Sequence, residues 1–279
     1  MRGALTDGLE NLLRDLDNGR VAAIRRIVIE ADRSADPAAV LAAVERHPYL
    51  ALRFVADGVV ATLDATTAET ALRESADAVR QVAMADVIAL SRGEADHALR
   101  PHLGSLNPTA TIVDAATAAP AVFAGHGAFD TDVGDVEAWL AVAGPRGDAA
   151  PLGGEAGRIR AFAVARKRHM PFAALERFVE YLAVLQAQRL IRVRGVVATG
   201  ENEAVVVEGT GSFFRPPLIV DRPVEPSIRF AVVTRDLDRE TFEGYLDAFL
   251  GEARVDRPDA QALTDNPLVV TGFSARSGN

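Results

Sequence analysis

The chain has 279 residues, of which 49% are hydrophobic and 25% are charged. This is the balance of a soluble globular protein long enough for two domains. No apolar run approaches the roughly 18 residues that a membrane-spanning helix needs, and the first residues lack the apolar core of a signal peptide. The chain contains no cysteine, which excludes disulfides, thiolate metal sites and cysteine nucleophiles. Together these features predict a cytoplasmic protein.

The net charge of −9 lies in the first half of the chain. Residues 1–150 carry 13 arginines and 22 acidic residues, whereas residues 151–279 carry 17 basic and 17 acidic residues. An acidic half without a basic stripe argues against nucleic acid as a partner.

Residues 1–119 alternate short apolar runs with amphipathic stretches. We expect helices at 4–16, 37–46, 67–84 and 97–106, and strands at 24–29, 58–63, 85–90 and 111–113. Asp36 and Pro37 suit the N-cap and the first position of the second helix. Strands of near-continuous apolar character alternating with helices are typical of a parallel sheet covered on both faces.

The composition changes after residue 119. Residues 120–156 are rich in Gly, Ala, Pro and Asp, which predicts a linker with room for one short helix around Trp139. Residues 157–251 then form a second unit, for which we expect strands at 158–165, 190–198, 203–209 and 228–234, and helices at 171–185 and 239–250. This pattern is typical of an α+β layer with helices on one face of an antiparallel sheet. Residues 252–279 form a polar tail.

Several segments carry motifs in a fixed order. In the first unit these are R-I-V-I-E-A-D-R-S-A-D-P-A-A-V-L, D-G-V-V-A-T-L-D-A and Q-V-A-M-A-D-V-I-A-L-S-R-G-E, and in the second R-I-R-A-F-A-V, R-L-I-R-V-R-G, F-F-R-P-P-L and D-N-P-L-V-V-T-G-F. They resemble motifs of the CobW family of P-loop GTP-binding proteins and metallochaperones across roughly residues 1–273. The resemblance implies an α/β fold: a truncated parallel-sheet P-loop GTPase-like domain at 1–119, followed by a smaller α+β CobW C-terminal domain at 157–251.

The chain departs from the family pattern at its start. In CobW proteins a P-loop, a switch strand and a C-x-C-C metal motif precede a V-R-G-D-L segment, whereas this chain opens with M-R-G-A-L. A Walker A loop requires Gly-Lys-Ser/Thr, because the lysine reaches the outer phosphate oxygens. The single lysine, Lys167, follows Arg166. The 279 residues therefore contain no Walker A loop.

The resemblance implies GTP and Mg²⁺ as cofactors, with Glu30, Ser91, Arg92 and Glu94 as candidate contacts. Glu30 matches the acidic residue that helps to hold Mg²⁺, and residues 91–94 replace the guanine-reading T-K-x-D. Arg33 stands where the family has a glycine that faces the γ-phosphate. Read without the family, Glu30 is an exposed carboxylate at a strand end and residues 91–94 form a solvated turn. The sequence indicates no catalytic residue and no metal site.

Two functions follow from these motifs. The first is a CobW-like GTP-binding protein related to zinc or cobalt chaperones, defective in GTP hydrolysis. The alternative is a non-catalytic binding protein, a pseudo-GTPase acting through its C-terminal domain. Expected partners are a client metalloprotein, an intact relative or a second copy of the chain, with no nucleic acid and no membrane.

The missing P-loop strand has a consequence for the fold. In the family this strand lies beside the one matched by 24–29, so its loss leaves an unpaired edge. We expect the first unit to re-pair its strands, to dimerise through that edge or to aggregate. The second unit should fold alone, with a protease-resistant core that begins near residue 157.

Overall fold

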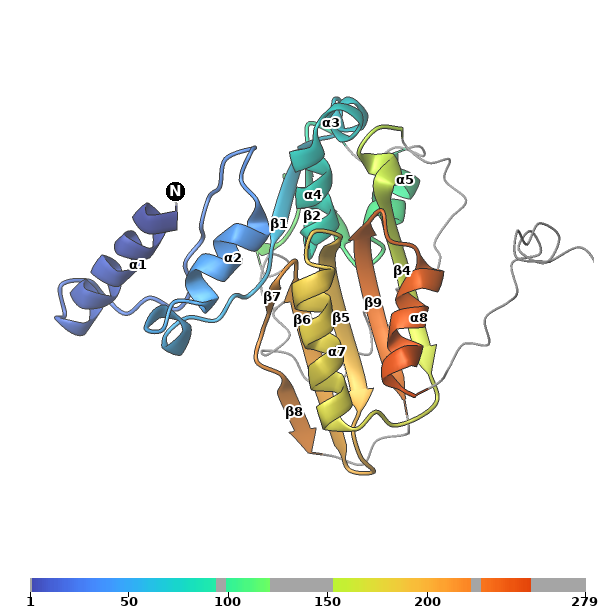
Figure 1. The fold of residues 1–279 in the computed structure, drawn as a ribbon. Coiled ribbons are helices and arrows are strands. Elements are labelled where there is room, and N and C mark those ends of the chain that lie inside the picture. Colours follow the sequence, from blue (N-terminus) through green and yellow to red (C-terminus); the bar gives the residue numbers. More distant parts are fainter. Residues whose placement is uncertain (1, 94–98, 121–152, 222–226, 252–279) are drawn as a thin grey trace, which may run out of the picture.

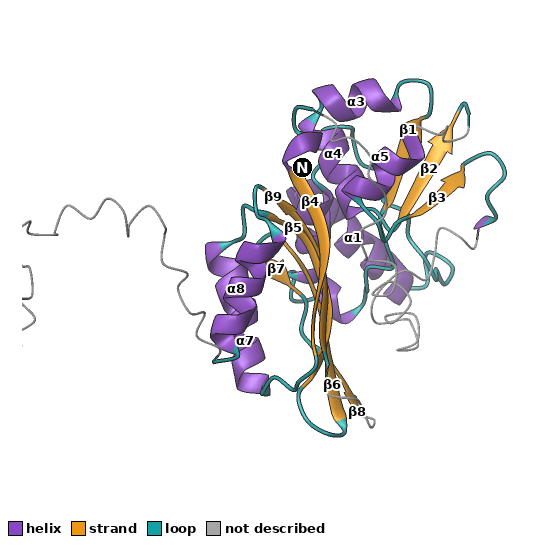
Figure 2. Cartoon of the chain, turned by 90° about the vertical axis from the view of Figure 1, so that its right-hand side faces the viewer, coloured by secondary structure: helices purple, strands orange, loops and turns teal. Residues whose placement is uncertain are grey.

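A computed structural model describes residues 2–93, 99–120, 153–221 and 227–251 (Figure 1). It contains a three-stranded parallel sheet and a six-stranded antiparallel sheet with helices between and outside them (Figure 2). Within these residues, no helix combines the length and the apolar character that a membrane crossing requires. The expected helix around Trp139, most of the linker and the tail lie outside the described residues.

The parallel sheet confirms the α/β expectation for the first unit. Its strands, in spatial order, are β1 (Val60–Asp64), β2 (Val87–Ser91) and β3 (Thr111–Asp114). The helices that accompany it are α3 (Ala68–Glu74), α4 (Ala76–Met84) and α5 (Leu99–Leu106). The single helix expected at 67–84 is two helices, because Ser75 has an extended backbone and its side chain caps α4 at Ala78 N.

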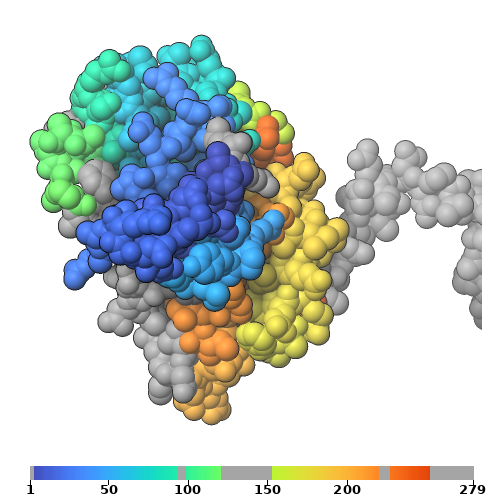
Figure 3. Space-filling view, turned by 90° about the vertical axis from the view of Figure 1, so that its left-hand side faces the viewer, coloured from blue at the N-terminus to red at the C-terminus, as the bar shows by residue number. Residues whose placement is uncertain are grey.

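Two N-terminal helices, α1 (Arg2–Asp17) and α2 (Pro37–Glu45), pack together with the short helix η1 (Leu50–Leu52). Their shared core consists of Leu9, Leu13, Val44 and Leu50. Asp36 caps α2 by accepting a hydrogen bond from Ala38 N at 3.0 Å, as the sequence predicts. The N-terminal segment covers one side of the molecule, next to the part of the chain that contains β6 to β8 (Figure 3).

The strand expected at 24–29 is wrong: these residues have no regular structure. Ile24, Val28 and Ile29 are 42%, 88% and 40% exposed, and only Ile27 packs against the core of α1 and α2. A strand requires a neighbour for its backbone groups, and β1 pairs only with β2 among the described strands. The apolar composition predicted the strand, but the described residues provide no partner for it.

The antiparallel sheet has the order β4-β9-β5-β6-β7, with β8 also paired to β6. Its strands are β4 (Ile159–Arg166), β5 (Leu190–Ala198), β6 (Glu203–Thr210), β7 (Phe213–Phe214), β8 (Leu218–Asp221) and β9 (Ile228–Arg235). Helices α7 (Phe172–Leu185) and α8 (Arg239–Phe249) pack on one face, as expected. A Cβ at Gly195 would lie 2.3 Å from the Phe230 ring, so only glycine allows β5 and β9 to pack this way.

The opposite face of this sheet packs against the first unit. Ile159 of β4 and Val233 of β9 share a core with Val82 of α4 and Leu103 of α5. Ala156, within the short helix η3 (Ala156–Arg158), is buried in the same core. The antiparallel sheet is therefore covered on both faces, and its second cover comes from residues far earlier in the chain.

Candidate functional site

The ends of the parallel strands place Ser91 beside Asp64. All three strands run in the same direction, and Asp64 of β1 is in register with Ser91 of β2. Ligands of open α/β sheets bind outside this carboxyl edge. The Ser91 hydroxyl donates to Leu63 O at 3.2 Å, so the side chain also ties the two strand ends together.

Arg92 begins the turn after β2 in a left-handed conformation, with φ 58°. Its Nη2 lies 2.5 Å from Asp64 Oδ2, while the side chain remains 75% exposed. Asp64 also accepts from Thr66 N at 3.0 Å and from Thr66 Oγ1 at 2.7 Å. The Thr66 hydroxyl and amide, with the Arg92 charge, lower the pKa of Asp64 below its usual range. Arg92 is thus held across the ends of β1 and β2 by an ionised carboxylate.

The other expected contacts are not gathered at this edge. Glu30 is exposed in the irregular segment before α2, and in the described part of the chain it forms no hydrogen bond or ion pair. Arg33 lies in a loop that α4 holds, because Gln81 Nε2 donates to Arg33 O at 2.9 Å and to Ala35 O at 3.0 Å. Glu94 lies outside the described residues. The structure therefore joins Ser91 and Arg92 to Asp64 and leaves Glu30 apart.

The described residues contain no group of three or more His, Asp or Glu side chains that could hold a metal ion.

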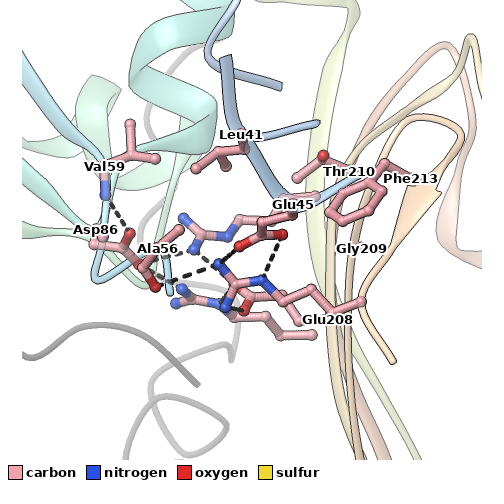
Figure 4. A pocket seen from close by; sticks show the side chains of 13 residues that line it. Leu41, Glu45, Ala56, Val59, Asp86, Glu208, Gly209, Thr210 and Phe213 are labelled. Carbon is pink, nitrogen blue, oxygen red and sulfur yellow. Dashed lines mark hydrogen bonds and ion pairs between the residues drawn. The ribbon is translucent and has the colours of Figure 1, made fainter. Parts of the chain in front are cut away.

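A second set of charged residues, not predicted from the sequence, lies where the two units meet. We call it the ion cluster: Glu45, Asp86, Arg192, Arg194, Glu208 and Arg215 (Figure 4). Each of these side chains is at most 11% exposed. The residues line a cavity of about 20 Å³, which has room for about one water molecule. The cluster is therefore a packed interface and not an organic ligand pocket.

Each carboxylate of the ion cluster contacts at least one guanidinium. Asp86 Oδ1 lies 2.9 Å from Arg192 and 2.5 Å from Arg194, and its Oδ2 accepts from Val59 N at 2.8 Å. Glu208 Oε1 is 2.9 Å from Arg192 and 3.0 Å from Arg194, while its Oε2 is 2.9 Å from Arg215. Two carboxylates and three arginines thus form one continuous network across the contact of the two units.

Glu45 attaches α2 to this network. Both of its carboxylate oxygens contact the Arg215 guanidinium, one of them at 3.0 Å. Burial raises the pKa of Glu45, and the Arg215 contact offsets only part of that effect. Burial also opposes ionisation of Glu208, yet the charges of Arg194, Arg192 and Arg215 lower its pKa to about 2.

One signal in the sequence could have located part of the cluster. Arg192 and Arg194 are two residues apart in an otherwise apolar strand, so they lie on the same face of a sheet. If that face of the strand is buried, the two arginines require carboxylate partners. The positions of Glu45 and Asp86 follow only from the tertiary structure.

Comparison with known proteins identifies the C-terminal unit. Residues 159–250 match the family described as the cobalamin synthesis protein cobW C-terminal domain. The zinc chaperone YjiA of Escherichia coli (strain K12) is 35% identical over 112 residues, which cover 39% of this chain and 35% of that protein. The match thus spans about a third of the length of this curated relative.

Solved structures extend the likeness in fold to most of the chain. The Zn(II)-bound YjiA GTPase from E. coli aligns with a TM-score of 0.70 and 23% identity, covering 90% of this chain and 77% of that one. A Zn(II)-bound triple mutant of the same protein aligns with a TM-score of 0.72 and 23% identity, covering 88% and 77%. Residues 159–250 therefore match the CobW C-terminal domain, and over most of its length the chain is similar in fold to the YjiA GTPase.

Proposed function

We propose that this chain is a CobW-type protein of metal handling, related to zinc and cobalt chaperones, and that it is defective in GTP hydrolysis. The first part draws support from the likeness to a protein described as a zinc chaperone and GTPase. The second part draws its main support from Arg92. Its guanidinium is paired with Asp64 at the edge where the family motif reads guanine, so packing against a base would require this ion pair to break.

Two neighbouring positions favour the same conclusion. Arg33 carries a long side chain where the family has a glycine, and a glycine is what permits close approach of a ligand to the backbone. Glu94 is one methylene longer than the aspartate of the motif. A misplacement of about 1 Å costs a reacting group on the order of 10²-fold in rate.

The test is a titration with a fluorescent GTP analogue in the presence of Mg²⁺, followed by a phosphate-release assay. We expect no saturable binding and no phosphate release by the native chain. The double variant Arg92→Lys, Glu94→Asp restores the lysine and the aspartate of the motif, and Arg73→Lys, Glu74→Asp makes the same two changes on α3 as a matched control. YjiA serves as the positive control for the assay. Saturable, Mg²⁺-dependent binding with phosphate release by the native chain would contradict the proposal.

A second candidate function is a non-catalytic binding protein that acts through the C-terminal domain. The observation that favours it is the end of α7, where the adjacent apolar side chains Val184 and Leu185 are 69% and 66% exposed. Adjacent exposed apolar residues of this size mark interaction sites when they belong to a larger patch. Saturable, Mg²⁺-dependent binding of GTP by the native chain would contradict this candidate as well.

A further inference from the structure

Helix α2 connects two contacts that lie at its opposite ends. Its C-terminal end is fixed to the C-terminal domain: Glu45 contacts Arg215, and Arg46 Nη2 donates to Ser212 O at 2.9 Å. The Arg46 guanidinium also lies 5.2 Å from the centre of the Phe213 ring, a distance at which a cation–π contact is favourable. The last turn of α2 is therefore held by the segment that follows β6.

The N-terminal end of α2 is continuous with the loop 31–36. Gln81 of α4 donates to the backbone oxygens of Arg33 and Ala35, and Asp36 both caps α2 and lies 3.9 Å from Arg80. The nine residues of α2 span about 13 Å as one uninterrupted helix. Between the loop and the ion cluster there is thus one rigid element with no break.

The ion cluster continues the path into both sheets. Arg215 contacts Glu208 of β6, which pairs with Arg192 and Arg194 of β5. The same arginines hold Asp86, whose carboxylate accepts from Val59 N just before β1. Because these groups are buried, a displacement of Glu45 must either carry Arg215 along or leave the Glu45 carboxylate without its guanidinium, which is costly.

We propose that α2 and the ion cluster form a coupling device: α2 acts as a lever that makes the loop 31–36 and the segment 208–215 of the C-terminal domain respond to each other. Whatever repositions the loop 31–36 then shifts the C-terminal domain, and the reverse holds because coupling between two sites is reciprocal. This inference rests on the contacts alone and does not require that the chain binds GTP.

The test perturbs each end and measures amide hydrogen exchange at the other end, in the full chain. Gln81→Ala removes the contacts to the loop, and we expect exchange of residues 208–215 to rise by about fivefold or more, the lower range of typical coupling. Glu45→Gln removes the charge at the cluster, and exchange of residues 31–36 should rise to a similar extent. Glu74→Gln, an exposed substitution at the end of α3, is the matched control and should change neither segment.

Two results would overturn the device. One is a Gln81→Ala chain in which faster exchange is confined to 31–36 and α4. The other is a Glu45→Gln chain in which it is confined to 43–46 and 208–216. If Glu45→Gln fails to fold, the Gln81→Ala variant decides alone, because Gln81 lies outside the buried cluster and its loss leaves the charges paired.

Discussion

Glu208 is the residue on which three arginines converge. It accepts from Arg192, Arg194 and Arg215 and is buried with them. We expect Glu208→Gln to lower the free energy of unfolding at pH 7 by about 3–5 kcal/mol, because it removes a carboxylate that three buried guanidinium groups share and leaves each of them with one carboxylate instead of two. Urea unfolding followed by circular dichroism measures the change. Glu201→Gln, exposed in the turn before β6, should stay within about 0.5 kcal/mol of the native chain.

The ionisation of Glu208 also makes the stability of the folded protein depend on pH. The pKa of Glu208 is about 2 in the folded protein, compared with an ordinary 4.5. A carboxyl with a depressed folded pKa stabilises the protein above its unfolded pKa, and this stabilisation is lost as the pH falls through the folded value. The difference in stability between the native chain and Glu208→Gln should therefore be constant above about pH 5 and shrink between pH 4.5 and 2. A difference that stays unchanged from pH 7 to pH 3 would show that the folded pKa is not depressed.

At the scale of single elements, Asn107 fixes the end of α4 to the end of α5. Its buried side-chain amide donates to Val82 O at 2.8 Å and to Ala85 O at 2.7 Å at the end of α4, where Val82 O also accepts from Ala85 N at 3.2 Å. We expect Asn107→Ala to cost about 2–3 kcal/mol, because buried acceptors lose their donor. Differential scanning calorimetry of the variant beside Asn18→Ala, which removes an exposed contact to Arg14 O, measures the cost. The exposed variant should lose under about 1 kcal/mol, and equal losses would contradict the role assigned to Asn107.

The elements that the sequence predicted are those whose cause is local. Helix α2 begins at Pro37 because Asp36 caps it, and α7 follows an amphipathic repeat that its buried residues confirm. The strand expected at 24–29 failed because a strand depends on a neighbour that the local pattern does not reveal. The short strands β7 and β8 were missed for the same reason: only pairing with β6 makes them strands.

In the candidate site, too, the sequence predicts the local features and misses those that depend on tertiary contacts. The motif placed Ser91 and Arg92 at the end of β2, where the structure has them, but the Asp64 partner of Arg92 follows from the register of two strands. The local pattern could not bring Glu45 and Asp86 into the ion cluster, because each is separated by more than 100 residues from the arginines that it contacts, as Asp86 is from Arg194 and Glu45 from Arg215. From the sequence alone, charged side chains are expected to face solvent, and only the tertiary structure shows which helix or strand buries them.

At the scale of the whole molecule, the two units share one core, which argues for a common unfolding transition. Val233 of β9 packs with Val82 of α4, and the ion cluster joins β5 to the residues before β2. Separating the units would expose this apolar face together with Arg192, Arg194 and Glu208. The core of α1, α2 and η1 is smaller and distinct from the others, so α1 should open more easily.

Native-state hydrogen exchange in increasing urea tests this arrangement. We expect the amides of β2, β5 and β9 to converge on one free energy of opening, with α1 at a lower value, because loss of the shared core removes support from both sheets. Glu208→Gln should then lower the protection of β2 and β5 by equal amounts, whereas Glu201→Gln should lower neither. The opposite result, in which β5 and β9 stay protected after β2 has opened, is what an autonomous domain beginning near residue 157 requires. It would mean that the buried charges and the shared apolar face contribute less to the stability of the C-terminal domain than the packing of its sheet against α7 and α8.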